Sequence, residues 1–223
     1  MEPVMGEGNP GQSIDPGFYQ RARELTAAHG SMFVVDSIQA GLRAQGVLSI
    51  VDYPGFESLE APDMESYSKA LNAGQFPLSV LALNPRAAAV FRHGVYGNTM
   101  TTNARGLDVA VAVLDSLSTT LRNNIRSRGE ELVSRLSLLA DELGDAITGV
   151  QGTGLLFSCE LDDRYKVYGE NSTEDYLRRR GLGVIHGGAK SLRYTPRFAI
   201  GDDEVELIID LTRDALENGP IRN

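Results

Sequence analysis

Apolar residues recur along the chain at two spacings, which predict its helices and strands. Asp15 can cap a first helix, Pro16 suits its first turn, and apolar residues at spacings of three and four continue it to Ala28. The same spacings predict helices over 84–91, 104–117, 121–143, 173–180 and 202–216. In the helix over 121–143, a stripe opposite the charged side chains is expected to face the core: Leu132, Leu136, Leu139 and Leu143.

Short apolar runs predict the strands. Residues 32–35 are apolar and Asp36 follows them directly, as expected where a buried parallel strand ends at a ligand site. Lys69 ends a second short segment and precedes a loop of small residues, where the backbone can approach a ligand closely. Asp36 and Lys69 are therefore candidates to hold opposite ends of one cofactor. Strands are predicted over 64–68, 78–83, 183–186 and 192–196, and residues 150–161 are expected to be a turn that leads into a strand.

The residue pattern changes near Ser118, where it becomes amphipathic and charged. Residues 1–117 are expected to form part of a large α/β domain, and residues 118–223 a smaller α+β domain. Residues 40–62 are irregular, and a loop of that length in a compact domain is usually functional or packs on a partner.

Composition and charge exclude several classes of function. The chain has 223 residues, of which 42% are hydrophobic, so it can bury the core of one large domain or two small ones. Its net charge is −9 and it has no block of Lys and Arg, which argues against a nucleic-acid or anionic-membrane surface. Its one cysteine, Cys159, lies in an apolar run and is expected to be a buried, inert thiol. No signal peptide is visible and no apolar stretch reaches the roughly 20 residues of a membrane span, so a soluble, cytoplasmic protein is expected.

Five stretches, in order, carry a resemblance that covers nearly the whole chain. They are Glu2-Pro3-Val4-Met5-Gly6-Glu7, Asp36-Ser37-Ile38-Gln39-Ala40-Gly41, Pro62-Asp63 through Lys69-Ala70-Leu71 to Gly74, Tyr96-Gly97-Asn98-Thr99-Met100-Thr101-Thr102-Asn103-Ala104, and Leu192-Arg193-Tyr194-Thr195-Pro196. Together they resemble the class III (ornithine/4-aminobutyrate type) aminotransferases, pyridoxal-phosphate enzymes of fold type I, whose large domain has a mixed, mostly parallel sheet. Each stretch alone is a weak signal, whereas the ordered set at matching spacing is specific. The chain departs from the family pattern at Ser37, where glutamate is usual, and at Met5, where glutamine is usual.

The resemblance implies four contacts to pyridoxal 5'-phosphate. Lys69 matches the lysine that forms the Schiff base, an internal aldimine, and then acts as general acid and base. Asp36 matches the carboxylate that keeps the pyridine nitrogen protonated, so that the ring can accept electrons. Gln39 matches a residue near the ring oxygen, and Thr99 matches one that donates to the phosphate across a dimer interface. The resemblance therefore also implies a homodimer with shared sites, and no metal ion.

Two further residues match substrate contacts of the family. Arg193 matches the arginine that binds the substrate carboxylate, because a planar guanidinium suits bidentate pairing. Glu7 matches the glutamate that in some members pairs with that arginine when a different substrate occupies the site. The resemblance thus implies an amino acid or amine donor and a keto acid acceptor such as 2-oxoglutarate. Plainer interpretations stay open: Lys69, Arg193 and Glu7 as surface charges, and Asp36 as a turn or helix cap.

Members of the family are considerably longer, so the chain would correspond to their C-terminal half. The glycine/serine loop and helix N-terminus that hold most of the phosphate, and the aromatic residue that stacks on the ring, would then precede Glu2. Two alternatives to an aminotransferase stay open. An aminomutase or racemase would share Asp36 and Lys69, and a truncated, non-catalytic dimerising module would use neither.

Overall fold

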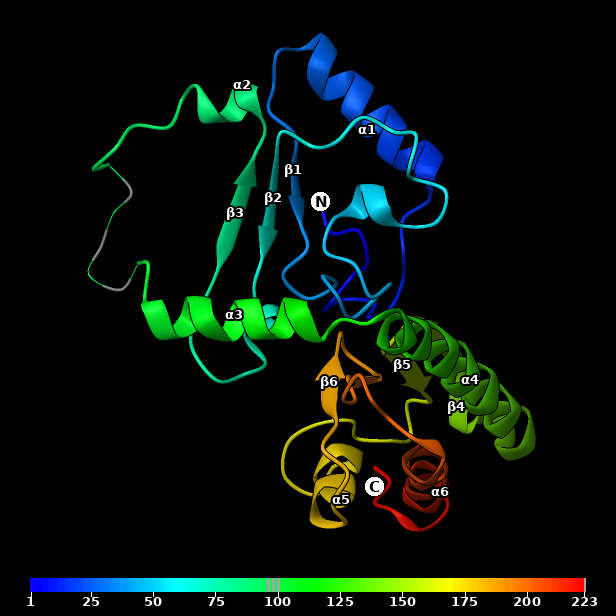
Figure 1. The fold of residues 1–223 in the computed structure, drawn as a ribbon. Helices are drawn as coiled ribbons and strands as arrows, with labels where there is room; N and C mark the ends of the chain where they lie inside the picture. Colours follow the sequence, from blue (N-terminus) through cyan, green and yellow to red (C-terminus); the bar gives the residue numbers. More distant parts are fainter. Residues whose placement is uncertain (96, 98, 100, 223) are drawn as a thin grey trace. The chain divides into compact units, whose positions relative to one another are not determined.

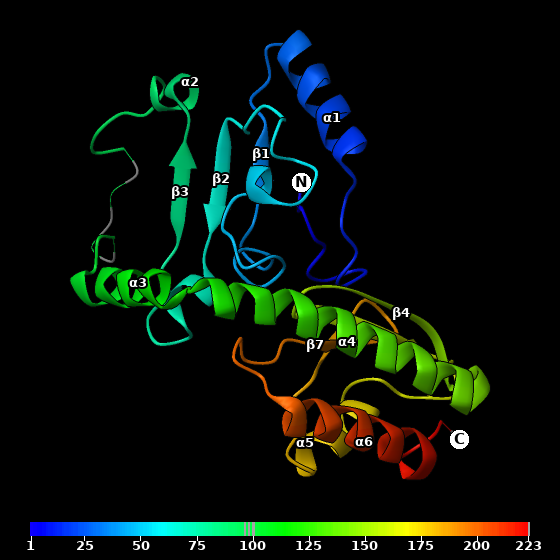
Figure 2. The same cartoon turned by 45° about the vertical axis from the view of Figure 1, so that its right-hand side comes forward.

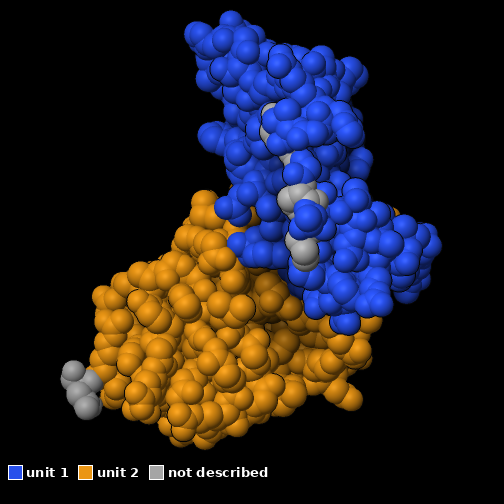
Figure 3. All heavy atoms as spheres, turned by 90° about the vertical axis from the view of Figure 1, so that its left-hand side faces the viewer, with its two compact units in different colours: residues 1–3, 14–120 blue, residues 4–13, 121–223 orange. Residues whose placement is uncertain are grey.

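The computed structural model describes residues 1–95, 97, 99 and 101–222. The chain forms two compact units (Figure 3). Unit 1 comprises Met1–Pro3 and Ile14–Thr120, and unit 2 comprises Val4–Ser13 and Leu121–Asn223. The domain boundary that we place after residue 117 stays a prediction. Within the described residues, no helix has the length and apolar character needed to cross a membrane.

Unit 1 is organised around a three-stranded sheet in the order β1-β2-β3 (Figure 1). β1 and β2 are parallel, whereas β3 is antiparallel to β2. The strands are β1 (Val34–Asp36), β2 (Met64–Tyr67) and β3 (Val80–Leu83). The helices are α1 (Pro16–Ala28), α2 (Pro85–Ala88), α3 (Ala104–Ser116) and the short 3-10 helices η1 (Ile50–Asp52) and η2 (Lys69–Asn72).

Helix α1 begins as its sequence predicts. The Asp15 side chain accepts a hydrogen bond from Phe18 N at 2.9 Å, which satisfies an amide that the helix itself leaves unpaired. The helix then buries Tyr19 between Phe33 and Phe56, with ring centroids 5.4 and 5.7 Å apart in edge-to-face geometry. This aromatic cluster fixes α1 next to the segment that leads into β1.

Unit 2 contains a four-stranded antiparallel sheet in the order β4-β5-β7-β6. Its strands are β4 (Ile147–Thr153), β5 (Leu156–Leu161), β6 (Ile185–Gly187) and β7 (Ser191–Tyr194). The helices of the C-terminal part, seen from a second side in Figure 2, are α4 (Thr119–Leu143), the 3-10 helix η3 (Gly144–Ala146), α5 (Thr173–Arg179) and α6 (Asp202–Asn218).

The core of unit 2 confirms two expectations from the sequence. Three leucines of the predicted stripe on α4 are buried in one core with the sheet residue Phe157: Leu132, Leu136 and Leu139. Cys159 lies fully buried in the same core, 3.7 Å from Tyr194 Oη. Burial raises the pKa of the Cys159 thiol to about 12, so at neutral pH this cysteine stays a protonated thiol rather than the reactive thiolate.

The turn that we expect from residue 150 is wrong. The structure instead has a strand over Ile147–Thr153, paired with β5, and the turn follows at Gly154. The glycine that suggests a turn is needed for packing, because a Cβ on Gly152 would lie 2.4 Å from Phe157 Cβ and 2.7 Å from Val133 Cγ2. Glycine inside a strand often marks such a close approach, so it is a poor turn signal here.

Candidate active site

In unit 1, β1 and β2 lie side by side (Figure 1), and their ends bring Asp36 and Lys69 to one edge of the sheet. Because β1 and β2 are parallel, their carboxyl ends share that edge, where Asp36 is the last residue of β1 and lies opposite Ser66. Lys69 follows Ser66 by three positions and begins η2. Ligands of open α/β sheets bind outside the carboxyl ends of the strands. Both residues therefore lie where a shared ligand could contact them.

Asp36 is held by hydrogen bonds to one of its two carboxylate oxygens. Its Oδ1 accepts from Ile38 N at 3.0 Å and from Ser66 Oγ at 3.3 Å. The contact with Ile38 closes an Asx turn at the end of β1, which fixes the half-buried side chain. Among the residues that the structure describes, none donates to Oδ2. One oxygen is thus held by the protein, and the other can accept an N–H from a ligand.

Lys69 combines an exposed side chain with a strained backbone. Its φ is 44°, in the left-handed region, which costs a residue other than glycine about 1–3 kcal/mol and is found most often at functional sites. The ammonium forms no hydrogen bond or ion pair with a described residue. The fold thus keeps this lysine in a costly conformation without using its charge for stability.

The other two lysines of the chain are engaged elsewhere. Lys166 Nζ donates to Glu170 O at 2.6 Å. Lys190 Nζ pairs with Asp163 at 2.6 Å, and this hydrogen bond raises the pKa of Lys190. A more firmly protonated amine is a poorer nucleophile, so Lys69 is the best placed of the three to react.

Gln39 and Thr99, the other predicted cofactor contacts, lie in turns. Gln39 is half-buried in the turn that follows β1, and it already has an interaction within the protein. Thr99 is exposed, and three residues of its motif lie outside the described residues: Tyr96, Asn98 and Met100. The cofactor contacts of Gln39 and Thr99 stay predictions.

In unit 2 the structure brings the two predicted substrate contacts together. Arg193 lies on β7 with 8% of its side chain exposed, and its Nη1 donates to Glu7 Oε1 at 2.7 Å. The segment Val4–Ser13, which carries Glu7, is tied to the sheet because Ser158 Oγ donates to Pro10 O at 2.7 Å. Glu7 itself is 62% exposed. The pair therefore consists of a fixed, buried guanidinium and a carboxylate at the surface.

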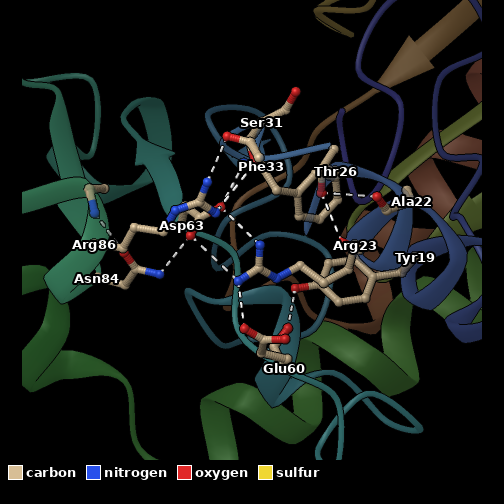
Figure 4. Close-up of polar contacts among 12 residues, drawn as sticks. Tyr19, Ala22, Arg23, Thr26, Ser31, Phe33, Glu60, Asp63, Asn84 and Arg86 are labelled. Atoms are coloured by element: carbon tan, nitrogen blue, oxygen red, sulfur yellow. Dashed lines mark hydrogen bonds and ion pairs between the residues drawn. The ribbon is translucent and has the colours of Figure 1, made fainter. Parts of the chain in front are cut away.

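Unit 1 also contains a buried ion-pair network that no motif in the sequence predicts (Figure 4). Asp63 is fully buried, and it accepts from Phe33 N at 2.8 Å, from Asn84 Nδ2 at 2.9 Å and from Arg23 Nη1 at 2.9 Å. Burial alone would raise the pKa of Asp63, but these hydrogen bonds and the charges of Arg23 and Arg86 hold it below 3.8. The three donors lie 21 to 40 positions from Asp63, so no local pattern shows them.

The residues at the sheet edge fit a pyridoxal-type cofactor in their chemistry. An aldehyde needs an amine, which Lys69 offers, and a pyridine nitrogen that keeps its proton needs a carboxylate, which Asp36 offers. The loop after Lys69 is open, since a Cβ added at Gly74 would meet no atom within 4 Å.

The chain is similar in sequence to known enzymes. The sequence model of the family described as aminotransferase class-III matches residues 1–216. The acetylornithine aminotransferase of Neisseria meningitidis serogroup B is 30% identical over 210 residues, which are 92% of this chain and 50% of that protein. The ornithine aminotransferase of Bacillus cereus (strain Q1) is 32% identical over 208 residues, which are 92% and 49% of the two chains. The chain thus spans about half the length of the curated relatives it matches.

Solved structures share its fold. The N-acetylornithine aminotransferase from Stenotrophomonas maltophilia K279a matches with a TM-score of 0.79 at 28% identity, over 96% of this chain and 54% of that one. The ornithine aminotransferase from Toxoplasma gondii ME49 matches with a TM-score of 0.81 at 26% identity, over 96% and 50% of the two chains. These neighbours are pyridoxal-phosphate enzymes of fold type I, which confirms the predicted fold class. Both its sequence and its fold show that the chain belongs to the class III aminotransferases, a family that uses pyridoxal phosphate.

Proposed function

We propose that this chain supplies the amine and the ring-nitrogen contact for pyridoxal phosphate in an aminotransferase that moves an amino group from an amino acid or amine to a keto acid such as 2-oxoglutarate. The observation that carries the proposal is the shared sheet edge of Asp36 and Lys69 in a chain of this family. The names of the relatives favour a donor of the ornithine type. Because the chain spans about half of their length, the activity of the whole enzyme, with sites shared in a homodimer, is part of the proposal.

The two residues at the sheet edge have distinct tasks. When bound, pyridoxal phosphate supplies an aldehyde that takes up the amino group and a ring that accepts electrons from the reacting carbon. Oδ2 of Asp36 would accept a hydrogen bond from the protonated ring nitrogen, while Oδ1 stays bound to Ile38 N and Ser66 Oγ and keeps the carboxylate from rotating. Lys69 offers its amine to the aldehyde and later moves a proton at the reacting carbon through Nζ. No hydrogen bond or ion pair with a described residue has to break when this side chain moves.

Arg193 is proposed to bind the substrate carboxylate in alternation with Glu7. The guanidinium is buried on β7, and its planar fork suits a carboxylate. Glu7 is 62% exposed, so its carboxylate can move into solvent, and the carboxylate of the acceptor then replaces it as the partner of the buried guanidinium. An amino donor that has no carboxylate facing Arg193 leaves the Arg193–Glu7 ion pair intact. A dicarboxylate acceptor instead displaces Glu7 and binds Arg193.

Titration of the purified protein with pyridoxal phosphate, followed by an amino-transfer assay, tests the proposal. We expect an absorbance band at about 410–430 nm that saturates with cofactor. Addition of an ornithine-type donor should then convert 2-oxoglutarate to glutamate. Rearrangement or racemisation of the donor without glutamate would indicate a mutase or racemase instead. If no band forms at saturating cofactor, the catalytic function is excluded for this chain and a dimerising module is favoured.

Arg193→Lys is expected to raise the KM for 2-oxoglutarate about 10- to 100-fold, because lysine cannot form the bidentate, charge-assisted contact worth about 1.5–3 kcal/mol. Glu7→Gln alters the same pair by removing the competing charge, so its KM should stay unchanged or fall. Steady-state kinetics with the acceptor and with a donor lacking this carboxylate measure both variants. An unchanged acceptor KM in Arg193→Lys would contradict the proposed role.

A further inference from the structure

Glu65 is a buried carboxylate surrounded by hydrogen-bond donors. It lies on β2 with 3% of its surface exposed. Its Oε1 accepts from Ser37 Oγ at 2.5 Å and from Ile50 N at 3.1 Å, and its Oε2 accepts from Ser49 Oγ at 2.7 Å. Across the described residues, no lysine or arginine forms an ion pair with it. A buried carboxylate is tolerated only when donors satisfy it, so these three contacts, together with a hydrogen bond from the Tyr67 side chain, take the place of a cation.

Neighbouring residues tie β1 and β2 together at the candidate site. On one face of the sheet, Ser66 Oγ donates to Asp36 Oδ1 at 3.3 Å. On the other face, Ser37, which directly follows β1, donates to Glu65, the residue of β2 that precedes Ser66. The main chain adds a hydrogen bond from Ser37 N to Ser66 O at 3.0 Å. Asp36 and Ser37 are therefore fixed together from both faces of the sheet.

We propose that Glu65, through Ser37, positions Asp36 against the cofactor ring, an inference that rests on the proposed function. The orientation of Asp36 depends on Ile38 N, and Ser37 links the two residues in the chain. Anchoring Ser37 in Glu65 holds this turn, so the open oxygen Oδ2 keeps its direction. Ser37 also stands where the family pattern has glutamate, and in this chain Glu65 on β2 brings a carboxylate to Ser37. Glu65 and Ser37 act through Asp36 and are positioning residues.

The test compares Ser37→Ala with Ser49→Ala, which each remove one serine donor from Glu65. Amide hydrogen exchange in the cofactor-free protein is measured at Ile38 N, which donates to the positioned carboxylate, and at Ile50 N. We expect Ser37→Ala to speed exchange at Ile38 about tenfold, the effect of about one lost hydrogen bond, and Ser49→Ala to change it less than about twofold. Ser49→Ala should speed exchange at Ile50 instead. Equal rates at Ile38 in both variants would overturn the inference, since a general loss of stability affects both amides alike.

Cofactor affinity separates this inference from the proposed function. We expect the Kd for pyridoxal phosphate, measured by absorbance, to rise about tenfold in Ser37→Ala and to stay within about twofold of wild type in Ser49→Ala. If wild type binds no pyridoxal phosphate, the proposed function fails, and the exchange rates at Ile38 alone decide whether Ser37 positions Asp36. If wild type binds it and the two variants bind it equally well, the proposed function stands and the positioning role is excluded.

Discussion

Lys69→Ala is expected to abolish the pyridoxal-phosphate band and to lower amino transfer about 100- to 10,000-fold, the usual contribution of a positioned general acid and base. Lys69 is exposed at the sheet edge, and its ammonium has no polar partner in the described part of the chain. Alanine keeps a Cβ at the left-handed φ of 44°, so the strain and the fold remain while the amine is lost. Urea unfolding should therefore show unchanged stability, which separates loss of chemistry from loss of structure.

The chain has three lysines, which allows the reacting one to be identified. Borohydride reduction fixes the cofactor to the lysine that holds it, and peptide mapping by mass spectrometry then locates the adduct. We expect it on Lys69. Lys190→Ala is the matched control, because Lys190 is already paired with Asp163, and this variant should keep the band and the rate. An adduct on Lys166 or Lys190, or a band that survives Lys69→Ala, would contradict the role of Lys69.

The position of Asp36 and Lys69 at one sheet edge could be predicted because the sequence signal for the end of a strand is local. An apolar run that stops at a charged residue marks the end of a buried strand, and Asp36 has such a run before it. The structure confirms the consequence, since β1 and β2 are parallel and Asp36 lies opposite Ser66, just ahead of Lys69. Helix α1 is predictable for the same reason: the cap at Asp15 and the amide that it satisfies are three positions apart.

The contacts that hold these strand ends depend on partners that are distant in sequence. Glu65 receives the hydrogen bonds of Ser37, Ser49 and Ile50 from 15 to 28 positions away, so in sequence it resembles an ordinary polar position of a strand with one exposed face. Which face of β2 is buried depends on the segments that pack on it, and no short stretch carries that information. β4 is missed for a related reason, because Gly152 is needed against Phe157 rather than for a turn.

The same kind of distant contact predicts a large loss of stability at Asp63. Asp63→Ala is expected to lower the free energy of unfolding by about 3–5 kcal/mol, because it leaves the buried Arg23 guanidinium without its carboxylate. The guanidinium then keeps only the exposed carboxylate of Glu60, and Arg23 Nε lacks a hydrogen-bond partner among the described residues. Glu60→Ala is the matched control: Glu60 pairs with the same guanidinium at 2.6 Å but is 71% exposed, and its loss should cost at most about 1 kcal/mol. Urea unfolding of both variants at neutral pH measures the difference, and equal losses would contradict the buried pairing.

The stability that the Asp63–Arg23 pair contributes is expected to fall as the pH is lowered. Burial acts to raise the pKa of Asp63, but the hydrogen bonds that it accepts and the charges of Arg23 and Arg86 lower it below 3.8. The folded state therefore binds this proton more weakly than the unfolded state does. Asp63 thus contributes its full stability above pH 3.8 and loses it as the pH falls through the lowered value. The difference in unfolding free energy between wild type and Asp63→Ala should be constant near neutral pH and shrink below pH 3.8. A difference that does not change with pH would mean that Asp63 stabilises unit 1 by packing, and not as a carboxylate paired with Arg23.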